Sequence, residues 1–152
     1  MLDIILQSLF ASLASTGFAM VFNVPKNTLK FCALGGFITY IIRASLLDFG
    51  LGIEISTFIA STIIGILALY WSRKYLIPRP VYTVASIIPM IPGTYAFAAM
   101  ISLVDMNTYG VSQELIESFI QNGLKSVFIL GAISFGLALP SLYFIRLNRP
   151  VI

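Results

Sequence analysis

The sequence lacks histidine and has a single cysteine, Cys32. Zinc, iron and haem sites need clusters of such ligands, and an intrachain disulfide needs two cysteines. Serine and threonine occur without a histidine base, no paired carboxylates stand at a plausible site, and no glycine-rich phosphate loop is present. We therefore expect no metal, no cofactor and no enzymatic activity.

Charge is also scarce, because only 10% of the 152 residues are charged, whereas soluble domains carry about 25%. Hydrophobic residues make up 59% of the chain, and its mean hydropathy is +0.97. Five apolar runs approach the length that crosses a bilayer. These features predict an all-α integral membrane protein with one five-helix transmembrane domain over residues 1–152. The expected spans are about 4–22, 31–47, 55–72, 81–104 and 115–145, and the short second one suits a regular, kinked or partly re-entrant helix equally.

The five spans separate the charges by sign. Apart from Arg43 and Lys125, the basic residues fall on one side of the membrane and the acidic residues on the other. The basic set is Lys26, Lys30, Arg73, Lys74, Arg79, Arg146 and Arg149, and the acidic set is Asp3, Asp48, Glu54, Asp105, Glu114 and Glu117. The positive-inside rule then predicts a multi-pass membrane protein with its N-terminus outside and its C-terminus in the cytoplasm. Because the basic residues do not gather on one face, a nucleic-acid partner is not expected.

The fourth span contains two prolines where an unbroken helix would otherwise run. Pro89 and Pro92 lack amide hydrogens, so the carbonyls of Ala85 and Ile88 should lose their helical partners. A second half-helix is expected to begin near Gly93 or Thr94, with glycine permitting close approach of backbone or ligand. The stretch is either a purely structural kink or a binding site. A site would comprise Pro89, Pro92, Gly93, Thr94 and Tyr95, with the positive end of the half-helix facing an anionic group.

Arg43 and Lys125 are the charges expected at membrane depth, where insertion costs roughly 2.5 to 3.5 kcal/mol. Arg43 either snorkels or pairs with Asp48 or Glu54, or it contacts a carboxylate substrate through its guanidinium fork. For Lys125, snorkelling or an ion pair with an acid of the same helix is favoured. No acidic residue lies deep in a span, so a proton relay would have to come from a partner.

Small residues recur at helical spacing on spans one, three and five. Such stripes let membrane helices approach closely, and helix packing is favoured over a ligand groove. The expected packing residues are Ser12, Thr57, Ser61, Gly65, Gly131 and Gly136. Between the first two spans, Pro25 indicates a turn, and Asn23 is expected to cap the helix that follows.

With these residues in view, the chain resembles the threonine/serine exporter (ThrE) family, in its short YjjB-type subunit. Four segments carry the resemblance: Gly17 to Pro25, Ser56 to Ser61, Trp71 to Arg73, and Ile88 to Gly93. The resemblance implies an inner-membrane exporter subunit that works with a larger YjjP-type membrane partner. It implies succinate as the substrate of the two-chain type, and threonine and serine for fused members. Arg43 falls where this type carries an arginine, and Asn23 in the first segment joins the candidate substrate-binding residues.

Two hypotheses of different class follow. The first is a transporter subunit that exports a small carboxylate, and the second is an assembly or stabilising subunit that does not transport. A channel is weaker, because no ring of polar residues marks a conduction path. The other expected contacts of the chain are with the lipid bilayer and, as an option, with further copies of itself in a homo-oligomer. If a partner supplies a related five-span half, the odd number of spans suggests an inverted repeat.

Overall fold

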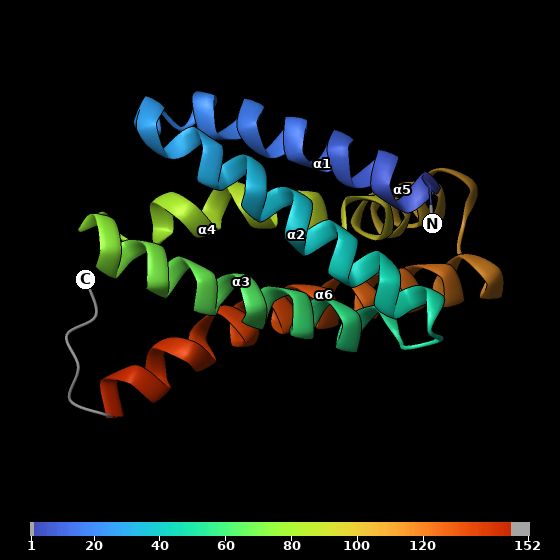
Figure 1. Cartoon of the computed structure of the whole chain (residues 1–152). Coiled ribbons are helices and arrows are strands. Elements are labelled where there is room, and N and C mark those ends of the chain that lie inside the picture. Colours follow the sequence, from blue (N-terminus) through green and yellow to red (C-terminus); the bar gives the residue numbers. More distant parts are fainter. Residues whose placement is uncertain (1, 147–152) are drawn as a thin grey trace. The chain divides into compact units, whose positions relative to one another are not determined.

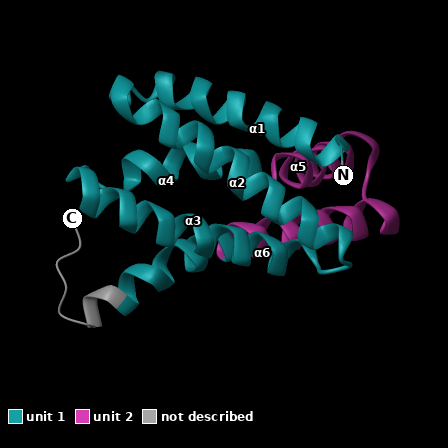
Figure 2. Cartoon of the chain, in the orientation of Figure 1, with its two compact units in different colours: residues 1–90, 132–152 teal, residues 91–131 magenta. Residues whose placement is uncertain are grey.

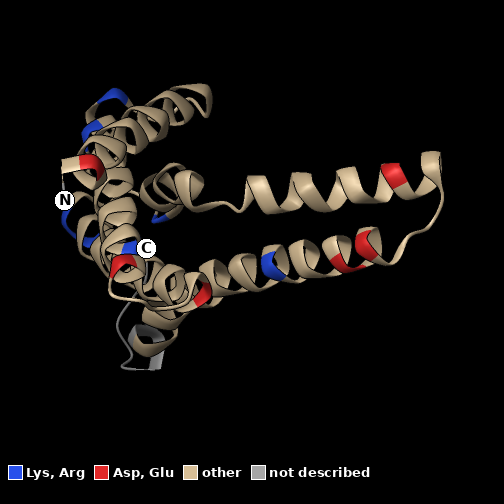
Figure 3. Cartoon of the chain, turned by 90° about the vertical axis from the view of Figure 1, so that its right-hand side faces the viewer, with Lys and Arg blue, Asp and Glu red and all other residues tan. Residues whose placement is uncertain are grey.

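The computed structural model describes residues 2–146, which form α-helices and two short 3-10 turns and contain no strand (Figure 1). The chain divides into two units, residues 1–90 with 132–152 and residues 91–131 (Figure 2). Arg149 lies outside the described residues, as does the side chain of Arg146. Segments coloured for charged residues are sparse along the ribbon (Figure 3). Each unit is described by itself.

Unit 1 contains α1 (Leu2–Val21), α2 (Leu29–Asp48), α3 (Ile53–Tyr75), α4 (Pro80–Ile87), the 3-10 turn η2 (Ile88–Met90) and the second part of α6 (Gln113–Arg146). The turn η1 (Lys26–Thr28) leads into α2. Helix α2 contacts α1, α3 and α4. It is continuous over 20 residues.

Unit 2 contains α5 (Gly93–Tyr109), a loop at 110–112 and the first part of α6. Gly110 ends α5 with φ of +94°, a conformation that favours glycine. The hydroxyls of Ser102 on α5 and Ser118 on α6 lie 2.9 Å apart and form a hydrogen bond. The two helices are thus joined as a hairpin by a polar contact.

Among the described residues, four helices are long and apolar enough to cross a membrane, and α4 with η2 and α5 forms a fifth span if the broken pair counts as one. The predicted all-α membrane fold, with its fourth span broken at the prolines, is confirmed. Helix bounds follow the apolar runs because backbone groups in lipid must be satisfied within the segment.

Several hydroxyl side chains in these helices are satisfied locally. Ser8, Thr57 and Thr62 donate to the carbonyl four residues earlier, at 2.7, 2.6 and 2.8 Å. Such bonds remove the cost of placing a hydroxyl among apolar groups. Small polar residues therefore occupy the buried helix faces of unit 1 and allow close approach.

An aromatic cluster joins α2, α3 and α4. Phe31 lies between Trp71, Tyr75 and Tyr82, with ring centroids 5.1, 5.0 and 5.7 Å away. The Trp71 and Tyr82 centroids are 5.8 Å apart. Trp71 is therefore a packing residue of unit 1.

Candidate functional site

The predicted site residues fall in both units. Asn23, Arg43 and Pro89 belong to unit 1, and the stretch 92–95 belongs to unit 2. The geometry of each group is given within its own unit.

Arg43 lies near the end of α2 and is half-buried. Its Nη1 donates a hydrogen bond of 2.9 Å to the backbone carbonyl of Met90, the last residue of η2. A helix end leaves carbonyls without intrahelical donors and carries partial negative charge. The guanidinium thus satisfies a backbone group that the break exposes and places positive charge where the dipole favours it.

Arg43 is one of three side chains on α2 that donate to backbone carbonyls of the α4 and η2 segment. The bonds are Cys32 Sγ to Val81 O at 3.3 Å, Thr39 Oγ1 to Ser86 O at 3.0 Å, and Arg43 Nη1 to Met90 O at 2.9 Å. The spacings of seven and four residues place the three donors on one helix face. This face of α2 follows the first half of the broken span up to the break.

Glycine permits this close approach. A methyl group at Gly35 would overlap the Ser86 hydroxyl, and one at Gly36 would overlap the hydroxyl of Ser15 on α1. The Gly35-Gly36 pair therefore lets α2 pack closely against two neighbours at once. The expected loss of a partner at the Ala85 carbonyl is wrong, because the amide of Ile88 donates to it and forms the 3-10 turn.

Unit 2 starts with a tight turn. Gly93 N donates to Ile91 O at 2.8 Å around Pro92, whose φ of −78° and ψ of 54° are those of an inverse γ-turn. Helix α5 then begins at Gly93, as the sequence predicted, with Pro92 as its N-cap. Its first bond runs from Ala96 N to Pro92 O, so the amides of Thr94 and Tyr95 have no intrahelical acceptor.

The side chains at this helix start differ in their surroundings. Thr94 is exposed, and a methyl group at Gly93 would meet nothing within 4 Å among the described residues, so the space at Gly93 is open to a ligand or other backbone. Tyr95 is half-buried, and Lys125 Nζ on α6 lies 5.3 Å from its ring centroid. A cation at this distance over an aromatic ring is attracted by the ring quadrupole.

Asn23 has a different local role from the one predicted. It adopts a left-handed conformation with φ of +59°, its amide donates to Met20 O, and the next amide, of Val24, donates to Ala19 O. This pair of bonds is a Schellman motif. Asn23 thus ends α1, and the expectation that it caps the following helix is wrong, since Pro25 is the N-cap of η1.

The packing residues differ among themselves. Ser61 Oγ lies 3.2 Å from Ala132 O, and a methyl group at Gly65 would lie 3.2 Å from Pro140 Cγ, so α3 and the second part of α6 are in close contact. Gly136 lies in the same seam. A methyl group at Gly131 would meet nothing within 4 Å among the described residues. Thr57 is buried on α3, while Ser12 on α1 is half-buried beside the buried Ser8, Ala11, Ser15 and Ala19.

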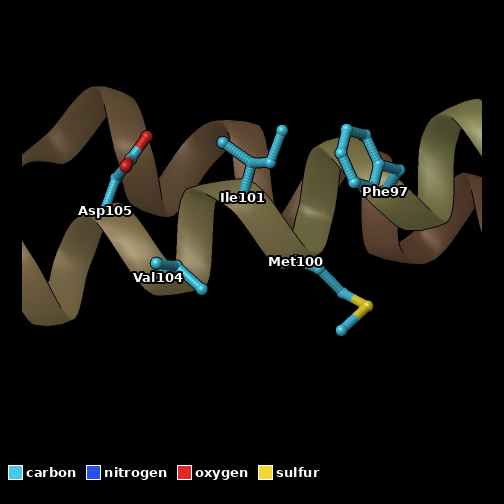
Figure 4. Close-up of a pocket in the computed structure, with 5 residues that line it drawn as sticks. All are labelled: Phe97, Met100, Ile101, Val104 and Asp105. Atoms are coloured by element: carbon cyan, nitrogen blue, oxygen red, sulfur yellow. The ribbon is translucent and has the colours of Figure 1, made fainter.

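An open groove lies along α5 and is lined by Phe97, Met100, Ile101, Val104 and Asp105 (Figure 4). The five side chains come from one helix and point to different sides of it rather than toward a common point. Such a surface suits lipid chains and provides no convergent polar groups for a ligand.

Sequence reasoning missed the α2 donors Cys32 and Thr39 and the acceptor of Arg43. It weighed only carboxylate partners for Arg43, although a proline break creates carbonyls that need donors. The seven-residue spacing from Cys32 to Thr39, followed by Arg43, was the available signal.

These features define a multi-pass membrane protein with one interrupted span whose freed backbone is held by neighbouring side chains, an arrangement common in transport proteins. The chain matches the family described as "Threonine/Serine exporter, ThrE" over residues 7–143, and it belongs to that family.

A relative from Haemophilus influenzae, described as an uncharacterized protein, is 45% identical over 152 residues. The alignment covers 100% of this chain and 51% of the relative, so the chain spans about half the length of the curated relative it matches. No solved structure matches the chain.

Proposed function

We propose that this chain is the YjjB-type subunit of an inner-membrane exporter of small carboxylate metabolites, with succinate as the favoured substrate and a larger YjjP-type membrane protein as partner. The observation that carries the proposal is the match to an exporter family over residues 7–143, on a chain whose fourth span is interrupted. Interrupted helices in transporters place backbone ends where substrates bind.

Carboxylate chemistry is supported in each unit separately. In unit 1, Arg43 carries its guanidinium to the end of the first half-helix. In unit 2, the first-turn amides of α5 lack intrahelical acceptors, and Lys125 lies over Tyr95 in that first turn. Cations and helix N-termini both favour an anionic ligand.

The length of the relative supports the proposal that a partner contributes to the transporter. The relative from Haemophilus influenzae is about twice as long as this chain. A transporter built of two halves would have room for both halves in the longer polypeptide of the relative. The odd number of spans would then invert one half relative to the other.

The sign of the charges supports the orientation of the proposal, with the N-terminus outside and the C-terminus in the cytoplasm. The break then lies nearer the cytoplasmic end of its span, since α4 with η2 is shorter than α5. A substrate would reach it first from the inside, as export requires.

Threonine and serine are the second candidate substrates, because the family description names them. Each carries a carboxylate, so the cationic groups above suit them too. A non-transporting assembly subunit is the alternative of another class, and the close seams of α1 with α2 and of α3 with α6 favour it.

Reconstitution tests the proposal. Proteoliposomes with the partner alone, with this chain alone and with both are loaded with radiolabelled succinate, threonine or serine, and efflux is measured. Efflux of succinate only when both proteins are present is the expected result. Full efflux from vesicles with the partner alone would contradict a transport role and favour an assembly role for this chain. Efflux of threonine and serine in preference to succinate would contradict succinate as the substrate.

A further inference from the structure

Lys125 is the only basic residue in unit 2. It is exposed on α6 and has exposed apolar neighbours, Leu124 and Phe128. At about 1.5 Å of rise per residue, it lies roughly 18 Å along α6 from Gln113. The ammonium group therefore needs a compensating partner in a largely apolar setting.

The ammonium group lies over an aromatic ring of its own hairpin. Lysines in spans commonly snorkel to the nearest interface. Here Nζ lies 5.3 Å from the centroid of Tyr95, which is roughly 21 Å along α5 from the end of that helix at Tyr109. Lys125 thus lies near the beginning of α5, at the end of the hairpin away from the loop at 110–112.

A counter-charge is missing from the hairpin around Lys125. No carboxylate of the described residues forms an ion pair with Lys125 Nζ, and Glu117 Oε1 instead accepts a hydrogen bond of 2.8 Å from Gln121 Nε2. The Tyr95 ring attracts the cation but leaves its charge uncompensated. The predicted ion pair of Lys125 with an acid of its own helix is therefore replaced by an aromatic contact.

The seam beside Lys125 contains further polar groups. Ser126 is 7% exposed, and its hydroxyl has no hydrogen-bond partner among the described residues. One and two turns earlier, Asn122 Nδ2 donates to Ser118 O at 2.8 Å, and Ser118 meets Ser102. Since buried hydroxyls are normally partnered, the Ser126 hydroxyl is a polar group that a water or a polar ligand would satisfy.

We propose that Lys125 Nζ, positioned by the Tyr95 ring, binds the carboxylate of the exported substrate. This inference rests on the proposed function and adds a binding residue to it. A small carboxylate is favoured over a carboxylate of a neighbouring protein helix for two reasons. The ammonium group lies over a ring of its own hairpin, and the neighbouring Ser126 has a buried hydroxyl without a hydrogen-bond partner among the described residues.

The test uses the chain reconstituted with its partner and measures efflux over a range of internal radiolabelled succinate concentrations. The Lys125→Gln variant is expected to raise the half-saturating succinate concentration about tenfold or more, the effect of losing a charged hydrogen bond. Its maximal rate and the amount of assembled complex should stay unchanged. Lys125→Arg should keep most of the affinity.

Lys74→Gln is the matched control. Lys74 Nζ also lies over aromatic rings, 5.9 Å from the Tyr70 centroid and 5.6 Å from the Tyr75 centroid, but in the last turn of α3. The half-saturating succinate concentration of the Lys74→Gln complex should equal that of the wild type. Tyr95→Leu, which removes the ring, should raise the half-saturating concentration.

Three results would overturn the inference. An unchanged half-saturating concentration in Lys125→Gln and Tyr95→Leu would show that the pair does not bind succinate. A lower maximal rate or lost assembly, with affinity unchanged, would show that Lys125 pairs with a protein carboxylate of the partner. Absence of carboxylate efflux from the wild-type complex would reject the proposed function itself, and the inference with it.

Discussion

Arg43 Nη1 and the carbonyl oxygen of Met90 lie 2.9 Å apart, and this bond joins the end of α2 to the end of the first half of the broken span. Non-helical backbone persists at membrane depth only where protein or water satisfies it. The same face of α2 also holds the Val81 and Ser86 carbonyls, through Cys32 and Thr39. The break is therefore a supported structure, and its support comes from a helix distant in sequence.

Replacing Arg43 by methionine should destabilise the protein by about 1 to 3 kcal/mol, because the Met90 carbonyl loses a charged donor. Arg43→Lys should recover part of the loss, since it retains a positive charge. Thermal unfolding of the purified protein in detergent measures the change, with the exposed Lys26→Gln in η1 as control. Equal stabilities for Arg43→Met and the control would contradict this role.

Two glycines of α6 should respond in opposite ways to alanine. At Gly136 a methyl group would lie 2.9 Å from Phe58 O and overlap the Ser61 hydroxyl, so Gly136→Ala should lower stability by about 1 to 3 kcal/mol. At Gly131 the space is open, and Gly131→Ala should raise stability by about 0.5 to 1 kcal/mol through helix propensity. Unfolding in increasing SDS compares the two, and similar shifts for both variants would disprove the described seam.

Trp71 is the single tryptophan, so its fluorescence reports on the aromatic cluster. Phe31→Ala should shift its emission to longer wavelength and cost roughly 2 kcal/mol or more through lost packing. Tyr82→Phe should leave emission and stability unchanged or slightly raise stability, because the buried Tyr82 hydroxyl has no hydrogen-bond partner among the described residues. A large destabilisation by Tyr82→Phe would reveal a partner for that hydroxyl.

The proposed orientation can be tested by thiol labelling. The native Cys32 is fully buried and gives little background. A membrane-impermeant maleimide should label Ser112→Cys, in the loop before α6, on intact cells. It should label Asn27→Cys, in η1, only after the membrane is permeabilised. The opposite pattern would reverse the predicted topology.

The spans and the break follow from the sequence because they depend on local chemistry. The second apolar run predicted a span at 31–47, and both of its bounds lie within two residues of those of α2. The two prolines located the start of α5 at Gly93. Each property acts within one segment of chain, so no knowledge of helix neighbours was needed.

Contacts between helices were not predictable in the same way. Gly131 and Gly136 have the same residue type and lie on the same helix, yet only Gly136 has neighbours that a methyl group would overlap. The acceptor of Arg43 and the ring beneath Lys125 depend on which helix faces meet. Asn23 was assigned to the wrong helix because asparagine suits both an N-cap and a left-handed C-terminal position.

The central claim is that the interrupted span serves carboxylate export, and one measurement tests it most directly. Succinate efflux is compared between proteoliposomes that contain the partner with the wild-type chain and those that contain it with Pro92→Ala or Gly93→Leu, at equal amounts of assembled complex. The account predicts that each substitution lowers efflux toward that of the partner alone. Efflux equal to wild type in both variants would contradict it.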